Sequence, residues 1–418
     1  MKKVRKMIYL LFGTVFLVTS CSQDKNLYDP ESTEKVTDLQ IPDGFSWATT
    51  QNIECSITSP MPTTTSIFLD ESCTEKGLIA TIPVSQNSTT ITLEVPTSST
   101  AIYVQYPTAS GKQVKKVDLN SVATKSTVDS KKAVISLPEN ATTDNNLIFS
   151  QTYTPAKNTY GTLMFEDLFP ELGDYDLNDF VAYYNTYSYC GNIVGALKGL
   201  ELNIQIRALG GSLPYQLCVQ LGYIPTKYVQ DYMTVRCNID GVTMKLLPQN
   251  GDEKAILVIT GLDKLKGSGE NYYNTVPGTT LSKESELPTI TCTIDNSNAY
   301  NADEYNAFKN TCDNPSTAFN FFLRNPNNNR EIHLRGYEPT KLYTNYANED
   351  PRHKGISYYS NSNLVWGIKV PAAIKHASER TDFTKAYKKF KNWVTTDGKN
   401  SKDWYNDPDP NSVITLKE

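Results

Sequence analysis

The sequence contains little histidine and has no basic block beyond its N-terminus. Among its 418 residues are only 3 His, and Asp plus Glu (45) outnumber Lys plus Arg (40), which gives a net charge of −5. So few histidines exclude a histidine-rich metal site and leave few candidates for a general base. The charge balance argues against nucleic acid as a partner.

The sequence also lacks the motifs of common catalytic and cofactor sites. No Cys-x-x-Cys pair, HExxH motif, P-loop, nucleophile elbow or dinucleotide fingerprint occurs. His333, His353 and His376 lie in patterns typical of structural or surface residues. We therefore predict that the protein is not an enzyme.

The N-terminus has the pattern of an exported lipoprotein. A basic start, an apolar run over 7–18 and small residues precede Cys21, which predicts a signal peptide over 1–20 and a lipid on the Cys21 sulfur. An ordinary signal peptide that happens to contain a cysteine is the alternative. Ser22 after the cysteine resembles lipoproteins sorted to the outer membrane, and the sequence leaves open whether the protein faces the cell surface or the periplasm.

The body of the chain is predicted to be soluble and held at the membrane by acyl chains, because no other apolar stretch reaches about 18 residues. Residues 21–42 are polar and rich in turn formers, which predicts a tether. Seven cysteines remain beyond Cys21. They could form disulfides in an exported compartment, with 55/73, 218/237 and 292/312 as conceivable pairs, or be small buried apolar residues.

Alternating apolar and polar residues indicate a mostly β protein of two modules. Short period-two runs separated by turn residues predict an Ig-like β-sandwich over 43–120. The Ser/Thr/Asn/Asp-rich segment 121–158 is predicted to be a linker. Longer strand-like runs and long loops over 159–418 predict a larger β-sandwich. It ends in a helix that Asp382 would cap and that has an apolar stripe from Phe383 to Trp393.

One acidic loop carries most of the chemistry. Six carboxylates lie between Glu166 and Asp179 without a Lys or Arg, and such a cluster repels itself unless a cation or backbone N–H groups neutralise it. Alternate oxygen side chains suit calcium, which takes six to eight oxygen ligands. We predict a calcium site whose ligands are the oxygen-bearing side chains of Asp167, Asp174, Asp176, Asn178 and Asp179.

The loop is not an EF-hand, because Asp179 stands where that motif needs Gly and Asn185 where it needs Glu. Aromatic and β-branched flanks place it between strands. The alternative interpretation is a polar hairpin with ordinary turn hydrogen bonds. Adjacent carboxylates do not indicate a glycosidase, whose two carboxylates face each other across a cleft.

The run from Met164 to Val181 resembles the signature of the LruC-domain family of bacterial surface lipoproteins. Weaker similarities occur at 332–340, 364–371, 386–393 and 403–405, so the resemblance covers 159–418. The segment after Pro371 departs from the pattern by being less aromatic. The resemblance implies a fold and a location but no activity.

Two functions fit these observations. The favoured one is a non-catalytic outer-membrane lipoprotein with a calcium-stabilised β-sandwich, which binds glycan or protein partners or mediates adhesion. The tyrosines of 183–189 and Tyr272–Tyr273 could line a sugar-binding surface, although strand tyrosines more often pack with a wet hydroxyl. The alternative is a calcium-dependent hydrolase of extracellular polymers, which needs a second carboxylate that sequence cannot place.

Overall fold

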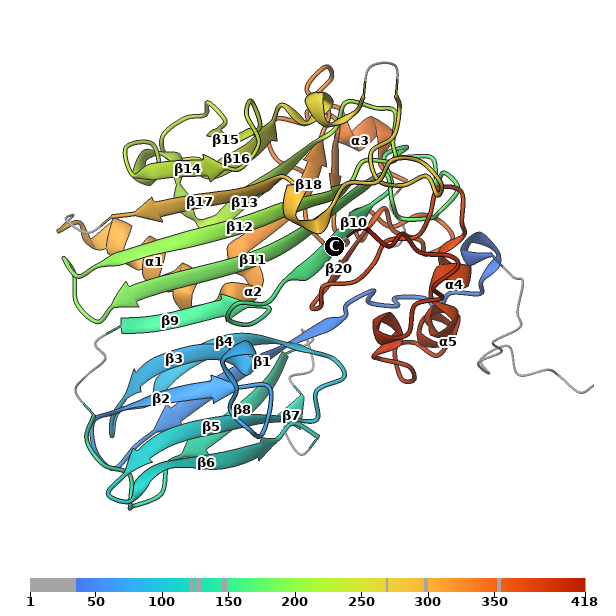
Figure 1. Cartoon of the computed structure of the whole chain (residues 1–418). Coiled ribbons are helices and arrows are strands. Elements are labelled where there is room, and N and C mark those ends of the chain that lie inside the picture. Colours follow the sequence, from blue (N-terminus) through green and yellow to red (C-terminus); the bar gives the residue numbers. More distant parts are fainter. Residues whose placement is uncertain are drawn as a thin grey trace, which may run out of the picture.

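The computed structural model describes residues 35–120, 123–124, 130–144, 149–267, 270–296, 300–351 and 355–417. They form mainly antiparallel β-sheets, and the α-helices among them all follow residue 300 (Figure 1). The prediction of a mostly β protein is therefore confirmed. The predicted signal peptide and Cys21 lie outside the described residues.

The first sandwich occupies the N-terminal part of the described chain. One layer has the strand order β4–β1–β8–β7, with β1 antiparallel to β4 and parallel to β8. The other layer is formed by β3, β2, β5 and β6. The strands are Thr50–Thr58 (β1), Thr63–Phe68 (β2), Leu78–Val84 (β3), Thr89–Pro96 (β4), Ala101–Thr108 (β5), Gly111–Asp118 (β6), Ala123–Thr124 (β7) and Ser130–Ser136 (β8). Inward residues such as Ile53, Ile67 and Val104 form one core between the layers.

The predicted linker over 121–158 is wrong where the structure places strands in it. β8 completes the first sandwich, and β9 (Phe149–Thr154) belongs to a larger sheet. Ala133 and Ile135 of β8 are buried, whereas Lys132 and Val134, which alternate with them, face solvent. The polar composition of the segment conceals a strand with only one apolar face.

The second sandwich consists of a long sheet packed on a five-stranded sheet. The long sheet includes β9 and the strands Gly161–Phe165 (β10), Phe180–Gly191 (β11), Lys198–Ala208 (β12), Met233–Cys237 (β14), Thr289–Asp295 (β17) and Gly367–Val370 (β20). The five-stranded sheet has the order β15–β16–β13–β18–β19. Its strands are Gln216–Pro225 (β13), Thr243–Leu246 (β15), Lys254–Thr260 (β16), Phe319–Arg324 (β18) and Glu331–His333 (β19).

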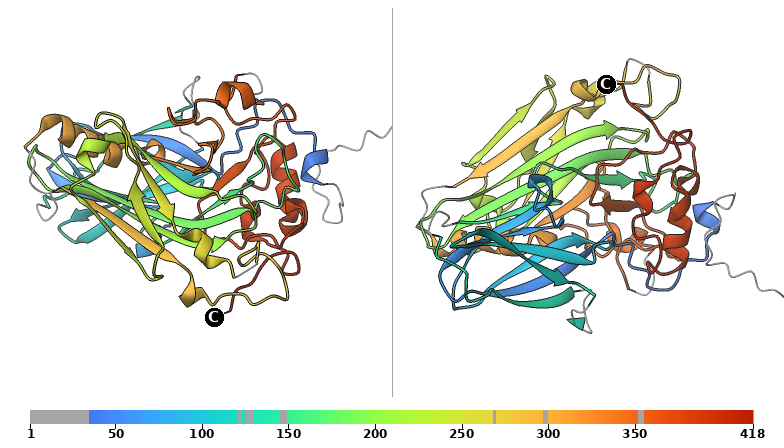
Figure 2. Two further views of the ribbon diagram at one scale, coloured as in Figure 1. Left: turned by 90° about the horizontal axis from the view of Figure 1, so that it is seen from above. Right: turned by 60° about the horizontal axis from the view of Figure 1, so that its bottom comes forward.

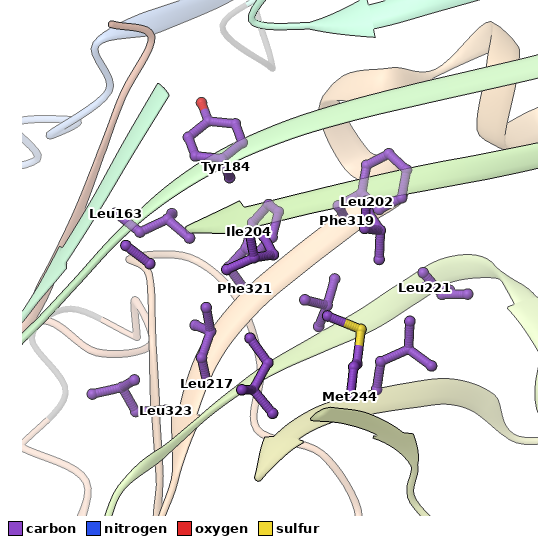
Figure 3. Packing of buried hydrophobic residues seen from close by; sticks show 14 of the residues in the cluster. Leu163, Tyr184, Leu202, Ile204, Leu217, Leu221, Met244, Phe319, Phe321 and Leu323 are labelled. Atoms are coloured by element: carbon purple, nitrogen blue, oxygen red, sulfur yellow. The ribbon is translucent and has the colours of Figure 1, made fainter. Parts of the chain in front are cut away.

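Alternate residues of the two sheets fill the core between them. Leu202 and Ile204 of β12 point toward Leu217 of β13 and Phe321 of β18 (Figure 3). All four side chains are almost completely buried. Burial on this scale is the main source of stability of such a sandwich, at about 25 cal/mol per Å² of apolar surface.

The two sandwiches share one sheet. β9 pairs with β11 on one side and, through Ala80 and Thr81, with β3 on the other, which makes a continuous sheet of 11 strands. An ion pair between the partly buried Lys369 of β20 and the buried Glu94 of β4, with a shortest N–O distance of 2.7 Å, also joins the modules. The modules are therefore fused rather than tethered.

Short helices close the ends of the second sandwich. The α-helices are Ala302–Asp313 (α1), Pro315–Ala318 (α2), Tyr346–Glu349 (α3), Phe383–Ala386 (α4) and Lys388–Thr395 (α5). The 3₁₀ turns are Val36–Asp38 (η1), Glu75–Gly77 (η2), Thr226–Tyr228 (η3), Leu262–Leu265 (η4), Glu284–Glu286 (η5) and Trp404–Asn406 (η6). α1 begins after Asn301, whose side chain accepts hydrogen bonds from the N–H groups of Asp303 and Glu304. The sequence analysis did not predict α1.

The predicted C-terminal helix is present in two pieces. Asp382 caps α4 as expected by accepting the Thr384 N–H, but Tyr387 leaves the helical region and separates α4 from α5. The apolar stripe from Phe383 to Trp393 is buried in a second core. There it packs on the β10–β20 edge of the long sheet, as shown by Met164 and Ile368 in the same core.

The end of the predicted tether is folded, which corrects its boundary at residue 42. Val36 and Leu39 are buried in the second core, followed by Phe45 and Trp47. The Val36 N–H donates to the Asp382 carboxylate at 3.0 Å. Apolar residues at these positions let the segment dock against α4 and α5 (Figure 2).

The seven cysteines of the described chain are all free. Five of them are buried (Cys55, Cys190, Cys218, Cys292 and Cys312), and the conceivable pairs are not formed. The alternative of small buried apolar residues is therefore the correct one. No helix in the described part of the chain is long and apolar enough to span a bilayer.

Candidate functional site: an acidic loop between two strands

The acidic segment forms the loop between β10 and β11, as expected from its strand-like flanks. Phe165 and Phe180 pair across the two strands and hold both ends of the loop. Tyr175 and Leu177 are fully buried, and the Tyr175 hydroxyl donates to the Val365 carbonyl at 2.7 Å. Both have positive φ angles (59° and 55°), so the backbone turns tightly and brings the intervening carboxylates together.

Three carboxylates of this loop converge. Glu166, Asp174 and Asp176 each place an oxygen within 4.8 Å of the others. Glu166 is completely buried, and its Oε1 accepts the Leu177 N–H at 2.6 Å. Its Oε2 is buried and has no hydrogen-bond partner among the described residues. We call these three residues the acidic cluster.

Backbone groups partly satisfy Asp176. Its Oδ2 accepts the Arg380 N–H at 2.7 Å, and its Oδ1 accepts the Asn178 N–H at 3.1 Å. The segment that precedes α4 therefore reaches the acidic cluster. Glu379 of that segment adds another carboxylate, which contributes to the raised pKa of Asp176 and whose own pKa is raised by burial and then by Asp174.

The charges in this region are not compensated. Burial, followed by Asp179, Asp176 and Asp174, raises the pKa of Glu166 well above its usual range. Burial and then Asp174 raise the pKa of Asp176 to about 8. In the described residues, neither Glu166 nor Asp176 forms an ion pair with Lys or Arg. Desolvated carboxylates without a counter-ion favour protonation or a bound cation.

Asp167 and Asp179 form a separate pair beside the acidic cluster. The Asp167 N–H donates to Asp179 Oδ2 at 2.8 Å, and Leu213 N–H donates to Asp167 Oδ2 at 3.3 Å. Burial, followed by Asp167, raises the pKa of Asp179 to about 8. Both carboxylates line a cavity of about 400 Å³ that Lys266 also borders.

Asn178 lies at the back of the loop. Its Nδ2 donates to the Ala377 carbonyl at 3.2 Å, while its buried Oδ1 has no hydrogen-bond partner among the described residues. A Cβ atom on Gly210 would lie 2.1 Å from that oxygen, so only glycine leaves room for it. Asn178 thus fixes the loop against the chain that follows β12.

Of the four predicted carboxylate ligands, the structure brings together two, Asp174 and Asp176. It adds Glu166, which the sequence analysis counted in the acidic run but did not assign as a ligand. Asp167 and Asp179 do not join the acidic cluster. Sequence reasoning missed Glu166 because the residue directly follows β10, and its inward orientation depends on where that strand ends. It missed Glu379 because no sequence pattern connects that residue to the loop.

The acidic cluster offers oxygen ligands and a charge of −3 when ionised. Hard divalent cations prefer such ligands, and calcium accepts irregular geometry.

The three histidines named in the sequence analysis do not belong to the acidic cluster. His333 is buried with its Nε2 2.9 Å from Glu331 Oε2, His376 Nε2 lies 2.7 Å from the Asn274 carbonyl, and His353 lies outside the described residues.

Two family models match this chain and together cover most of it. Residues 195–405 match the domain of unknown function DUF4842, and residues 63–132 match the domain of unknown function DUF4841. No curated protein matches the chain. Neither model carries the LruC name that the sequence resemblance implied.

Among solved structures, a protein from Bacteroides ovatus described as a candidate lipoprotein has a similar fold. Its TM-score is 0.67 at 22% identity, and the match covers 85% of this chain and 99% of that one. The major pilin subunit of Bacillus cereus is 9% identical over 68% of this chain and 67% of its own, with a TM-score of 0.15. The RrgB pilus protein of Streptococcus pneumoniae is 8% identical over 59% and 45%, with a TM-score of 0.16. Scores this low establish no common fold.

Proposed function

We propose a function for this chain, which belongs to the family of the domain of unknown function DUF4842, from the geometry of its acidic cluster. It is a non-catalytic, lipid-anchored surface protein whose second sandwich is stabilised by calcium. The observation that carries the proposal is the fully buried Glu166 Oε2. It has no hydrogen-bond partner in the described chain and belongs to a carboxylate that converges with Asp174 and Asp176.

Calcium at the acidic cluster would act as a structural brace. Asp176 contacts the Arg380 backbone, and Asp382, two residues further on, caps α4 and accepts the Val36 N–H. A cation that neutralises the acidic cluster would therefore hold the β10–β11 loop against the second core. Mutual repulsion of the carboxylates would otherwise weaken that contact.

Anchoring through lipid on Cys21 is the second part of the proposal. The N-terminal pattern supports it, and so does the similar fold of a protein described as a candidate lipoprotein. The outer membrane is the proposed location because Ser22 follows Cys21. A protein held there would meet glycan or protein partners or mediate adhesion, and these are the proposed partner classes.

The geometry of the carboxylates supports a non-catalytic role over a hydrolase. Asp167 and Asp179 both border the 400 Å³ cavity, but Asp179 Oδ2 accepts the Asp167 N–H and the two carboxyl groups lie in hydrogen-bond contact. Glycosidases hold their two carboxylates about 5 to 9 Å apart. We therefore assign this pair to the support of the loop.

Calcium titration of the chain from Ser22 onward, which keeps every described residue, tests the proposal. We expect saturable heat and a thermal midpoint that rises with calcium; occupancy at 100 times the Kd corresponds to about 2.7 kcal/mol. The double variant Asp174→Ala/Asp176→Ala should lose both signals. Glu171→Ala, an exposed carboxylate in the same loop, should keep them. Absence of both signals in the unaltered chain would refute the calcium site.

A further inference from the structure

The outer face of the long sheet carries a row of tyrosines. Odd-numbered residues of β11 point away from the core, so Tyr187 and Tyr189 are half-exposed, while Tyr184 is buried against Phe321. Tyr153 of β9 lies directly opposite Tyr187. We call Tyr153, Tyr187 and Tyr189 the tyrosine row.

The rings of the tyrosine row are stacked and held in place. Tyr153 and Tyr187 have centroids 4.8 Å apart and planes inclined by 13°, and the Tyr187–Tyr189 distance is 5.4 Å at 28°. Gln151 donates to the Tyr187 hydroxyl at 2.9 Å. Gly199 lies opposite Tyr189, and a Cβ there would be 2.5 Å from the Tyr189 hydroxyl, so the glycine lets the ring reach across β12.

A polar hollow continues from the tyrosine row across the same face. Strand register places Glu201 beside Tyr187, then Thr293 of β17 beside Glu201. A cavity of about 460 Å³ opens there and includes Glu201, Asp231, Arg236, Thr291, Thr293 and Asp295 in its lining. We call this cavity the acidic hollow. Its three carboxylates outnumber its single guanidinium, which favours an uncharged ligand over an anionic one.

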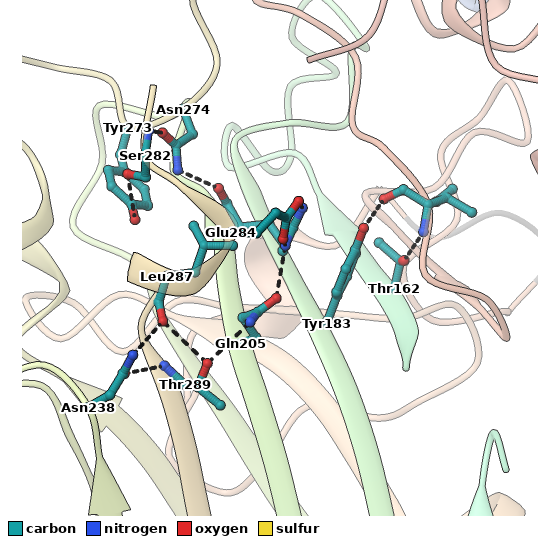
Figure 4. A network of polar contacts seen from close by, with 12 residues as sticks. Thr162, Tyr183, Gln205, Asn238, Tyr273, Asn274, Ser282, Glu284, Leu287 and Thr289 are labelled. Carbon is teal, nitrogen blue, oxygen red and sulfur yellow. Dashed lines mark hydrogen bonds and ion pairs between the residues drawn. The ribbon is translucent and has the colours of Figure 1, made fainter. Parts of the chain in front are cut away.

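The polar side chains near the acidic hollow are already oriented. Asn203 Nδ2 donates to Glu201 Oε1 at 2.7 Å, and the Thr291 hydroxyl donates to Asn203 Oδ1 at 2.7 Å. Toward the other end of the face, Gln205 and Arg207 bond to each other, and Glu284 pairs with Arg207 (Figure 4). That end is occupied by the protein's own groups, so the tyrosine row and the acidic hollow form the open part of the face.

We propose that the tyrosine row and the acidic hollow together bind an uncharged glycan chain. Tyr187 stacks against both other rings, so the flat faces left for the C–H faces of pyranose sugars are the faces of Tyr153 and Tyr189 that point away from Tyr187. Fixed carboxylate and hydroxyl oxygens suit the sugar hydroxyl groups. Repulsion from Glu201, Asp231 and Asp295 disfavours acidic glycans. This inference deepens the proposed function, because it identifies the partner class of a surface-anchored protein and the face that recognises it.

Affinity electrophoresis of the chain from Ser22 tests this site, with gels containing mannan, xyloglucan, arabinogalactan or the acidic polygalacturonate. We expect at least one neutral polysaccharide to retard the protein and polygalacturonate not to. Tyr187→Ala, which removes the ring against which Tyr153 and Tyr189 are stacked, should weaken retardation about tenfold, the scale of a lost aromatic contact. Glu201→Gln, which keeps the side-chain shape, should also weaken it. Tyr300→Ala, an 86% exposed tyrosine outside the tyrosine row, should leave retardation unchanged.

The outcomes separate this site from the calcium site. Each gel is run with calcium and with EDTA, and thermal midpoints of the same samples report calcium binding and folding. Retardation without a calcium-dependent midpoint would support the glycan site and refute the calcium site. No retardation by any neutral polysaccharide, or equal retardation of Tyr187→Ala, would overturn the glycan proposal. A dimer that Tyr187→Ala dissociates in sedimentation would also overturn it, because a second copy would then occupy the face.

Discussion

Among single residues, Glu166 most clearly favours either protonation of the β10–β11 loop or a cation bound to it. One carboxylate oxygen is bonded to the Leu177 N–H, and the other is buried without a partner in the described chain. Asp174 and Asp176 lie within 4.8 Å, so an ionised Glu166 increases the repulsion within the acidic cluster. The same charge becomes favourable once a cation binds.

Replacing Glu166 by Gln should therefore have opposite effects under two conditions. In EDTA, Glu166→Gln should raise the free energy of unfolding by about 1 to 3 kcal/mol, because the amide is neutral without having to take up a proton on folding, as the buried Glu166 must, and it can keep a hydrogen bond to Leu177. In saturating calcium, the variant should be less stable than the unaltered chain. Urea unfolding in both conditions measures this. Glu171→Gln, exposed in the same loop, is the control, and effects of equal sign in both conditions would contradict the prediction.

The raised pKa values of Asp176 and Asp179, each about 8, predict a pH dependence of the calcium-free protein. The folded state keeps protons that the unfolded chain releases near pH 4, so their stabilising contribution is complete below that pH and is lost as the pH rises toward about 8. The thermal midpoint in EDTA should fall between pH 5 and pH 9. In calcium the part of the fall that comes from Asp176 should disappear, because the cation replaces its proton, whereas the part from Asp179, which lies outside the acidic cluster, should remain. A midpoint in EDTA that does not change with pH would contradict this.

At the scale of elements, periodicity predicted the strands that have one apolar and one polar face. The runs 52–57, 90–95 and 101–106 fall inside β1, β4 and β5. β8 was missed because an apolar residue, Val134, also stands on its exposed face and blurs the alternation, and because its parallel pairing with β1 depends on contacts distant in sequence. In the acidic loop, the spacing predicted Asp174 and Asp176, whereas Glu166 depends on how β10 ends.

The joint between the N-terminal segment and α4 depends on one carboxylate. Asp382 accepts the N–H groups of Thr384 at 2.9 Å and Val36 at 3.0 Å. Asp382→Ala should lower the free energy of unfolding by about 2 kcal/mol, because it removes a helix cap and leaves a buried N–H unpaired. Asp403→Ala, which precedes η6 without a capping bond, should change it by less than about 0.5 kcal/mol. Urea midpoints of the two variants measure the difference, and equal losses would contradict it.

At the scale of the whole molecule, the 11-stranded sheet is the main feature that the sequence did not reveal. Each module was predicted separately because each has its own turns and strand periodicity. The pairing of β9 with β3 depends on residues about 70 positions apart. It replaces a predicted linker with a continuous sheet, so the modules should not move as independent bodies.

The shared sheet predicts one cooperative unfolding transition for the described chain, seen as a single peak in calorimetry. Glu94→Gln should lower its midpoint and reduce stability by about 3 kcal/mol, because Lys369 would stay buried without its counter-ion. Glu54→Gln is the matched control, since its pair with Lys132 is partly exposed and should contribute less than about 1 kcal/mol. Two separate peaks would show that the modules unfold independently.

The docked segment from Val36 to Trp47 has a mechanical consequence. A pull on a membrane-anchored N-terminus would first load the Val36–Asp382 hydrogen bonds and the second core rather than β1. If that segment peeled away, its 12 residues would span at most about 40 Å when fully extended, at about 3.3 to 3.6 Å per residue. The protein could thus lengthen its reach under shear while both sandwiches, and the face that carries the tyrosine row, stay folded.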